Sequence, residues 1–282
     1  MERSLEQPMV SIIMPTYNRG YMICGAIESV QAQTYQNWEL LVVDDGSTDN
    51  TAALFGTKTD PRIRYIQQQN AGAAAARNHG LSISRGTWVS YLDSDNELLP
   101  HYLETMLAWI TQNPHTVFAA PRAHRTLELY REGKLIQTID DSADTPPGLT
   151  LRDVFMKNLH FDTNGFMHLR SLYDEGIRWD ETLGAMEDWD IAMTIGEKYP
   201  HGFLYVEEVL YNYHQRYGGD GLVSSKTYSD WADIFESIYR KHRHNPLLAG
   251  QKWYPAKVQK WRKLQREFET GKLPPYYLYY FQ

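Results

Sequence analysis

The first hundred residues alternate between short apolar segments and segments with helical periodicity. We expect buried strands at the four apolar segments, which are residues 10–14, 38–43, 63–66 and 89–92. Between them apolar residues recur at helical spacing, as at Ile23, Ala26 and Val30. Repeated strand–helix alternation predicts an α/β fold with a mainly parallel sheet and right-handed crossovers.

The local signals refine this outline. Pro15 is expected to end the first strand because it lacks a backbone donor. Residues 47–50 are rich in N-cap side chains and are expected to start a helix that reaches Phe55. Later in the chain we expect a helix at 101–113, a strand at 117–120, a hairpin with a loop at 122–150 and a strand at 166–170. Further helices are expected near 187, 231 and 257–268.

Polar side chains follow three of the four predicted strands. These are Thr16 with Tyr17, Asp45, and the pair Asp93 and Asp95. The carboxyl ends of parallel strands meet at one rim of the sheet, where ligands bind in open α/β folds. Each residue alone has an ordinary explanation as a surface aromatic or a solvated turn. Their shared rim favours a binding site.

Each of these polar groups suits part of a nucleotide. Tyr17 can stack on a base, Asp45 can accept a hydrogen bond from a base N–H, and Arg77 can reach the rings or a phosphate. Asp93 can accept a hydrogen bond from a ribose hydroxyl. Two carboxylates one residue apart also suit Mg²⁺, which is usually held by one or two carboxylates together with waters and substrate phosphates.

Composition restricts the classes of protein. Apolar residues make up 42% and charged residues 22%, as in ordinary soluble proteins. The net charge of −7 argues against non-specific binding of nucleic acid. The single cysteine, Cys24, excludes an internal disulfide and fits a reducing compartment. The polar start does not resemble a signal peptide and no apolar run is long enough to span a membrane, so we expect a cytoplasmic protein.

The charge is concentrated near the end of the chain. Residues 239–272 hold ten Lys and Arg against two Glu, a balance of +8 that leaves −15 for the remainder. Two interpretations remain open for this basic and aromatic segment. Its helices pack on the rest of the protein, or they rest on anionic lipid as a peripheral membrane contact at the inner membrane face.

Four ordered motifs resemble those of family 2 glycosyltransferases, which have the GT-A (Rossmann-like) fold. The motifs are Pro15-Thr16-Tyr17-Asn18-Arg19, Val42-Val43-Asp44-Asp45-Gly46-Ser47-Thr48-Asp49, Asn70-Ala71-Gly72 with Ala76-Arg77-Asn78, and Leu92-Asp93-Ser94-Asp95. The resemblance covers roughly residues 9–220. It implies a nucleotide-sugar donor, usually a UDP-sugar, and Mn²⁺ or Mg²⁺ beneath its diphosphate.

The resemblance also implies residue roles. The donor would be bound by Pro15, Thr16, Tyr17, Asp45, Arg77, Asp93, Ser94 and Arg216. The metal would be bound by Asp95, Asp93 and His214. The stretch from Glu187 to Asp190 resembles the acidic motif at the start of the acceptor-side helix, where the second acid is the usual catalytic base. We therefore expect Asp188 to be the base, with Glu187 as the alternative.

One departure from the family pattern leaves the third metal ligand open. Many relatives place a basic residue two positions before a histidine, whereas this chain has His214 and then Arg216. Either His214 reaches the metal or Arg216 contacts the diphosphate. The Gly-rich residues 218–221 that follow are expected to form a lid over the donor. His168 is expected to be a packed or hydrogen-bonded histidine.

The resemblance implies a GT-A domain at 1–225, with a nucleotide-sugar-binding half at about 1–115 and an acceptor half at 116–225. Residues 226–282 form a helical extension. The expected activity is inverting transfer of a sugar to the hydroxyl of a glycan, lipid-linked or other acceptor. Rival interpretations are a non-catalytic nucleotide-sugar-binding module and a sugar nucleotidyltransferase. The latter ranks lower because residues 15–19 are not a Gly-rich loop.

Overall fold

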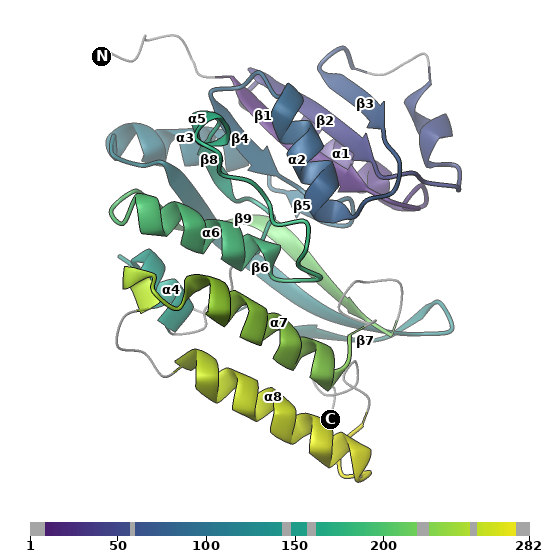
Figure 1. Ribbon diagram of the computed structural model, residues 1–282. Helices are drawn as coiled ribbons and strands as arrows, with labels where there is room; N and C mark the ends of the chain where they lie inside the picture. The colour runs from purple at the N-terminus through teal and green to yellow at the C-terminus, as the bar shows by residue number, and fades with distance from the viewer. Residues whose placement is uncertain are drawn as a thin grey trace.

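The computed structural model describes residues 9–56, 60–142, 148–156, 162–218, 226–248 and 253–274. Its first part is the predicted parallel sheet, drawn in purple and blue in Figure 1. Four strands lie in the order β3-β2-β1-β4 and are all parallel. Their bounds are Val10–Thr16 for β1, Trp38–Asp44 for β2, Ile63–Gln67 for β3 and Trp88–Tyr91 for β4.

Two local expectations need correction. Pro15 does not end β1, which continues to Thr16 with Pro15 in register with Val43 of β2. Proline is tolerated there because β4 pairs with β1 only as far as Ile13, so no β4 partner lies beside Pro15. The segment after residue 47 forms a 3₁₀ helix over Thr51–Phe55 rather than an α-helix.

The later strands extend the sheet with mixed directions. After β4 the order continues β8-β6-β9-β5, and β7 pairs with β6. β6 is parallel to β9, whereas the β4–β8, β6–β8, β6–β7 and β5–β9 pairs are antiparallel. The bounds are Glu97–Leu98 for β5, Phe118–Arg131 for β6, Lys134–Asp140 for β7, Met167–Leu169 for β8 and Phe203–Tyr217 for β9. The mainly parallel arrangement predicted from the sequence holds throughout β3-β2-β1-β4, whereas the second half of the sheet combines antiparallel pairs with the parallel β6–β9 pair.

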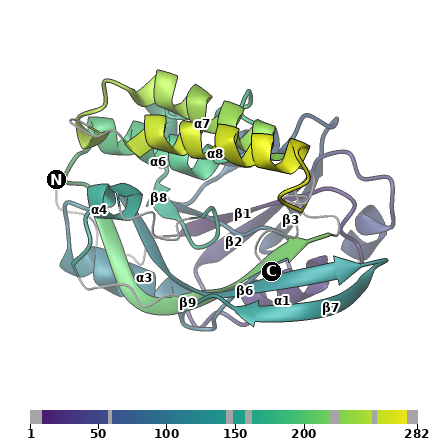
Figure 2. The ribbon, with the colours of Figure 1, turned by 90° about the horizontal axis from the view of Figure 1, so that it is seen from below.

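Helices cover both faces of this sheet. Their bounds are Ile23–Gln31 for α1, Ala73–Ile83 for α2, Tyr102–Gln112 for α3, Leu151–Met156 for α4, Ser171–Asp174 for α5, Glu187–Lys198 for α6, Tyr228–His242 for α7 and Trp253–Glu269 for α8. Figure 1 shows α6, α7 and α8 stacked in succession. Figure 2 shows this stack on one side of the sheet, with α1 and α3 on the other.

The sheet lies between two hydrophobic cores, and successive side chains of a strand enter them alternately. In β1, Ile12 and Met14 pack in the core that contains α1 and α3, whereas Ile13 packs in the core that contains α2, α6, α7 and α8. Successive side chains of a strand point to opposite faces, so one strand supplies both cores. The second core extends as far as Trp261 and Leu264 of α8, both of which are buried.

The C-terminal helices turn their apolar residues inward. α7 begins at a capping box in which the Thr227 side chain and Asp230 satisfy each other's backbone donors. Trp261 lies beside Trp231, with ring centroids 6.0 Å apart. Among the described helices none has the length and apolar character needed to cross a bilayer. The predicted lid, apart from Gly218, and the aromatic residues at 275–281 fall outside the described ranges.

Candidate active site

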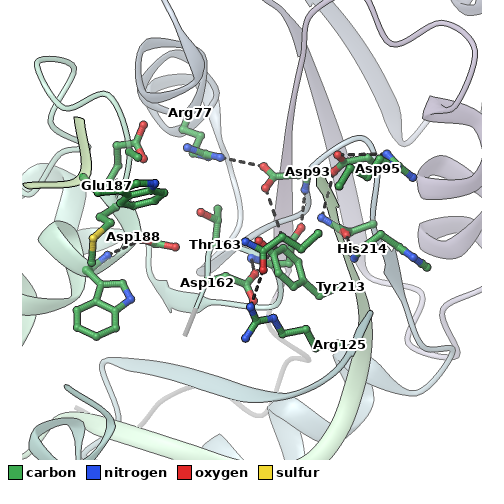
Figure 3. Close-up of a pocket in the computed structure, with 18 residues that line it drawn as sticks. Arg77, Asp93, Asp95, Arg125, Asp162, Thr163, Glu187, Asp188, Tyr213 and His214 are labelled. Carbon is green, nitrogen blue, oxygen red and sulfur yellow. Dashed lines mark hydrogen bonds and ion pairs between the residues drawn. The ribbon is translucent and has the colours of Figure 1, made fainter. Parts of the chain in front are cut away.

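A cavity of about 300 Å³ lies where the end of β4 meets the start of α6 and the C-terminal end of β9 (Figure 3). Seven of the residues predicted from the sequence line it, and they come from distant parts of the chain. They are Arg77, Asp93, Asp95, Glu187, Asp188, His214 and Arg216. The structure thus brings the predicted metal-binding and base residues into a single pocket.

Asp93 is held from two directions. The Arg77 Nη2 atom lies 2.8 Å from Asp93 Oδ1, and the Arg77 side chain is almost fully buried. Asn164 accepts a hydrogen bond from the Asp93 backbone N–H at 2.7 Å and donates to Asp93 Oδ2 at 3.3 Å. Asn164 in turn donates to Asp162 Oδ1 at 2.9 Å. These contacts fix the direction of the Asp93 carboxylate within the pocket.

The negative charge of Asp95 is balanced by fewer close contacts than that of Asp93. Its nearest described cation is Arg216, with Nη1 3.3 Å from Asp95 Oδ2. Burial, and next the neighbouring charge of Asp93, raise the pKa of Asp95 to about 6 despite Arg216. A buried carboxylate in this state is stabilised by additional positive charge, since an opposite charge favours the ionised form.

Glu128 of β6 connects His214 and Arg216, which lie on β9. The His214 Nδ1 atom is 2.9 Å from Glu128 Oε1, and Arg216 Nε is 3.3 Å from Glu128 Oε2. Burial opposes ionisation of Glu128, but hydrogen bonds from Tyr130 and His214 outweigh it and lower the pKa of this carboxyl. With Nδ1 donating to Glu128, the remaining nitrogen of His214 is an acceptor.

The first turn of α6 carries two acids into the pocket. Glu187 and Asp188 open the helix directly after Met186, which has a left-handed backbone with φ of 62°. Burial, then the charges of Glu187 and Asp162, raise the pKa of Asp188 to about 8. Burial also raises the pKa of Glu187. Both acids therefore retain a proton more readily than an exposed carboxyl group.

The other predicted donor residues lie along the same edge of the sheet but do not line this cavity. Tyr17 is exposed just beyond β1, whereas Thr16 and Ser94 are buried. The Asp45 carboxylate accepts hydrogen bonds from Gln68 Nε2, Ala71 N and Gly72 N at 2.7 to 2.9 Å. In this structure Asp45 thus anchors the loop that leads into α2, and its contact with a base stays a prediction.

His168 is a structural histidine, as expected. It is buried, its Nε2 lies 2.8 Å from the Tyr91 hydroxyl, and its Nδ1 lies 2.8 Å from the Leu169 carbonyl oxygen. Burial lowers the pKa of His168 to about 4, so the ring is neutral near pH 7.

Sequence reasoning missed several polar residues of the pocket. Asp162 and Asn164 precede a very short strand, and Arg125 lies in a strand that is far longer than expected. The same long strand carries Glu128, which does not line the cavity but contacts His214 and Arg216. Arg125 contacts Asp141 and Gln215, at 2.9 and 2.6 Å. The only available signal was the polar composition of residues 122–128 and 162–164, which is equally typical of loops.

Residues 11–177 match the sequence profile described as Glycosyl transferase family 2. The chain belongs to this family. The match ends before α6, so the acids of α6 and the residues of β9 lie beyond the part that identifies the glycosyl transferase.

Two curated glycosyl transferases illustrate the range of similarity. WcaA of Escherichia coli K12, named for colanic acid biosynthesis, is 29% identical over 259 residues, which covers 87% of this chain and 85% of WcaA. WfgD of Escherichia coli is named UDP-Glc:alpha-D-GlcNAc-diphosphoundecaprenol beta-1,3-glucosyltransferase. It is 42% identical over 110 residues, which covers 39% of this chain and 44% of WfgD.

Other relatives are much longer than the matched region, which spans about a fifth of three uncharacterized rickettsial glycosyltransferases. Among solved structures, TarS 1-349 of S. aureus, crystallised in complex with UDP-GlcNAc, has a TM-score of 0.67 at 21% identity. The alignment covers 93% of this chain and 73% of TarS 1-349. These comparisons confirm the predicted family and the GT-A fold of this glycosyl transferase.

Proposed function

We propose that the protein transfers a sugar from a UDP-sugar to an acceptor hydroxyl, with inversion at the anomeric carbon and with the help of Mn²⁺ or Mg²⁺. The observation that carries this proposal is the placement of acids on two walls of a single cavity. Figure 3 shows Asp188 and Glu187 approaching from one side and Asp95 and His214 from the other. Such an arrangement separates a base from the site of a leaving diphosphate.

The carboxylates of Asp93 and Asp95 fit a divalent cation. Both line the cavity, and the raised pKa of Asp95 reflects burial and the neighbouring charge of Asp93. No group of three or more metal-binding side chains is found within the described ranges. A site with two carboxylates is nevertheless typical of Mg²⁺, which takes its remaining ligands from water and substrate phosphates. When bound, the cation would neutralise negative charge on the diphosphate as it leaves.

His214 is proposed as an additional ligand. A metal-binding histidine almost always donates its second ring N–H to a carboxylate, carbonyl or water. The hydrogen bond between His214 Nδ1 and Glu128 supplies this arrangement and leaves Nε2 as the ligand atom. Arg216 lies between Glu128 and Asp95, so it is placed to pair with a donor phosphate once a cation occupies Asp95.

Asp188 would act as the base. The acceptor hydroxyl attacks the anomeric carbon, its proton passes to the Asp188 carboxylate, and the bond from that carbon to the diphosphate oxygen breaks. Such a single displacement inverts the anomeric centre. A positioned base contributes typically about 10²- to 10⁴-fold to the rate. Glu187 is the alternative base, since it occupies the same turn and lines the same cavity.

The choice of uridine rests on the relatives. TarS was crystallised with UDP-GlcNAc and WfgD is named for a UDP-Glc donor and a lipid-diphosphate acceptor. Tyr17 and Asp45 are proposed to contact the base beyond the cavity, along the same edge of the sheet. Glycan and lipid-linked acceptors both remain candidates, and the exposed basic residues of α8 are compatible with contact to anionic lipid.

A panel of nucleotide-sugars tests the proposal. Thermal unfolding is measured with UDP-GlcNAc, UDP-Glc, UDP-Gal and GDP-Man, each with Mn²⁺ or with EDTA. A ligand present at 100 times its dissociation constant stabilises the folded protein by about 2.7 kcal/mol. We expect a UDP-sugar to stabilise the protein only with Mn²⁺, and Asp95→Ala to abolish that effect.

Release of UDP then separates an enzyme from a binding module. The protein with Mn²⁺ and the stabilising donor is expected to release UDP, slowly to water and faster to an acceptor. Stabilisation without any UDP release would favour the non-catalytic binding module. Stabilisation by no UDP-sugar would contradict the proposed donor.

A further inference from the structure

A third acid in the first turn of α6 has a different environment from its neighbours. Glu187 and Asp188 line the cavity, whereas Asp190 is completely buried on the other side of the turn. An ionised carboxylate in such a position requires partners, because an uncompensated buried charge is costly. The partners of Asp190 therefore show what holds this turn.

Those partners come from the end of α7. His242 Nε2 donates to Asp190 Oδ1 at 2.8 Å, and both side chains are at most 3% exposed. Lys241 Nζ lies 2.8 Å from Asp190 Oδ2 and 2.6 Å from Asp180 Oδ2. Shortly after α7, Asn245 Nδ2 donates to the carbonyl oxygen of Met193 in the middle of α6. We call the contacts of Asp190 with His242 and Lys241 the α6–α7 clamp.

Within the turn, Asp188 Oδ1 accepts a hydrogen bond from the Trp189 backbone N–H at 2.8 Å, and Trp189 is buried in the core, so the clamp adds to local contacts. The residue before the helix, Met186, has a left-handed backbone and provides no side-chain cap. A non-glycine residue in that conformation costs about 1–3 kcal/mol and persists only where its surroundings impose it. The adjacent acids Glu187 and Asp188 also repel one another, and this repulsion adds to burial in raising the pKa of Asp188.

We propose that Asp190 is a positioning residue for Asp188, and that the C-terminal helices hold the proposed base in place through the α6–α7 clamp. This inference rests on the proposed function for its catalytic meaning. The clamp joins α6 to a helix that also places Trp231 on the wall of the cavity. α7 is therefore part of the structure that forms the proposed active site.

The first test compares Asp190→Asn and Lys241→Gln with Arg240→Gln. Arg240 is the neighbouring cation on α7, but it is exposed and pairs with Glu236. UDP release with Mn²⁺ and the stabilising UDP-sugar gives kcat and KM. We expect Asp190→Asn to lower kcat by about 10- to 100-fold, because small misplacement of a reacting group is costly. Donor KM should change less than about 3-fold, and Arg240→Gln should behave as wild type.

The pH dependence separates positioning from a loss of folded protein. The charged groups that face Asp188 are Glu187, Asp162 and Arg77, and all three are unchanged in these variants. A looser turn admits water and lowers the pKa of Asp188. Asp190→Asn also removes a negative charge, which by itself lowers that pKa, whereas Lys241→Gln removes a positive charge, which by itself raises it. Movement of the rising limb of kcat/KM to lower pH in Lys241→Gln as well as in Asp190→Asn therefore reports a looser turn. If the clamp has a purely structural role, these replacements reduce the amount of active protein, but Lys241→Gln does not lower the pH at which kcat/KM rises. A pH profile that does not move to lower pH in Lys241→Gln would therefore overturn the proposal.

Hydrogen exchange provides a readout that does not require activity. Peptides covering residues 186–192 should exchange faster in Asp190→Asn and in Lys241→Gln, while peptides from β1 and β4 keep their protection. If wild type releases no UDP from any donor but this exchange pattern holds, the proposed function fails and the clamp stands. If neither variant alters exchange at 186–192, the clamp does not position the turn. Should Asp190→Asn fail to fold, Lys241→Gln decides, since Lys241 is 42% exposed.

Discussion

Asp188 is surrounded by groups that oppose its ionisation. Its burial and the charges of Glu187 and Asp162 raise its pKa to about 8, whereas Arg77 works in the opposite direction. A general base must be ionised in order to accept a proton, and catalysis is most effective when its pKa lies near the working pH. Perturbed pKa values of this kind cluster at functional sites.

The residue-scale prediction is that Asp188→Asn lowers kcat by about 10²- to 10⁴-fold. In the wild type, kcat/KM should rise as pH increases through about 8, because the protonated form of Asp188 predominates below that pH. UDP release between pH 5.5 and 9.5 measures both effects. Donor-induced thermal stabilisation in the presence of Mn²⁺ should persist in Asp188→Asn. Near-normal turnover would assign the base to Glu187, which Glu187→Gln then tests.

The residues that could be predicted from sequence are those with a chemical signature of their own. The Asp93 and Asp95 pair was recognisable in this way, whereas the acids of α6 were assigned through the resemblance to the acidic motif of the family. Asn164 and Glu128 were not, because their significance depends on partners that are 71 and 86 residues away. A single amide or carboxylate in a polar stretch shows nothing of its partner until the chain has folded.

At the scale of elements, Asp45 connects β2 to the start of α2. Its carboxylate accepts two backbone N–H groups from residues 71 and 72 and one side-chain amide from Gln68. Gly72, with φ of 94°, provides the turn before the helix. This carboxylate thereby sets the position of the helix that carries Arg77 into the pocket.

We predict that Asp45→Ala lowers the free energy of unfolding by about 1–3 kcal/mol, because hydrogen bonds to a charged and buried acceptor are lost. Asp45→Asn should cost less, since one acceptor oxygen remains. Urea unfolding followed by circular dichroism measures both. If Asp45→Ala is as stable as wild type, these hydrogen bonds contribute little, and the main use of Asp45 is the contact with the base of the donor.

Element prediction succeeded where hydrophobic period and length agreed. The first four strands and the helices α1 and α2 follow from local patterns, as does the hairpin within 122–150, whereas the segment between β2 and β3 forms a 3₁₀ helix. The 14 and 15 residues of β6 and β9 did not, because only part of each strand is apolar. The half-buried parts of both strands carry polar side chains that line the pocket or contact its residues. Polar segments of this kind are equally typical of loops.

For the molecule as a whole, the core that contains α2 and α6 is continuous with α8. Trp261 is 7% exposed and packs against Trp231, Phe235 and Tyr228. Lys260, Lys263 and Arg266 lie on the outer side of α8, whereas Lys257 and Arg262 are half-buried and contact Phe235 and Ser229 of α7. Sequence reasoning left packing and membrane contact as alternatives. The described helices pack on the body, and contact of their outer side with lipid stays a prediction.

Trp261→Ala should therefore destabilise the whole protein and not α8 alone. A truncation of this size in a core costs about 3–5 kcal/mol, and each kcal/mol corresponds to a melting point lower by about 2–4 °C. Thermal unfolding should show one transition, coincident in far- and near-ultraviolet circular dichroism. Lys260→Ala, at an exposed neighbouring position, is the matched control. A separate early transition confined to part of the helical signal would show that α8 unfolds independently.

The α6–α7 clamp has a consequence for the newly made chain. The ribosome adds about 5–20 residues per second, so His242 emerges about 7–30 seconds after Asp95. During that interval the nascent chain has the strands that lead to Asp93 and Asp95, but the helix that would hold Asp188 in place has not left the exit tunnel. We therefore expect a nascent chain that ends before α7 to cleave sugar donors more slowly than the longer chain.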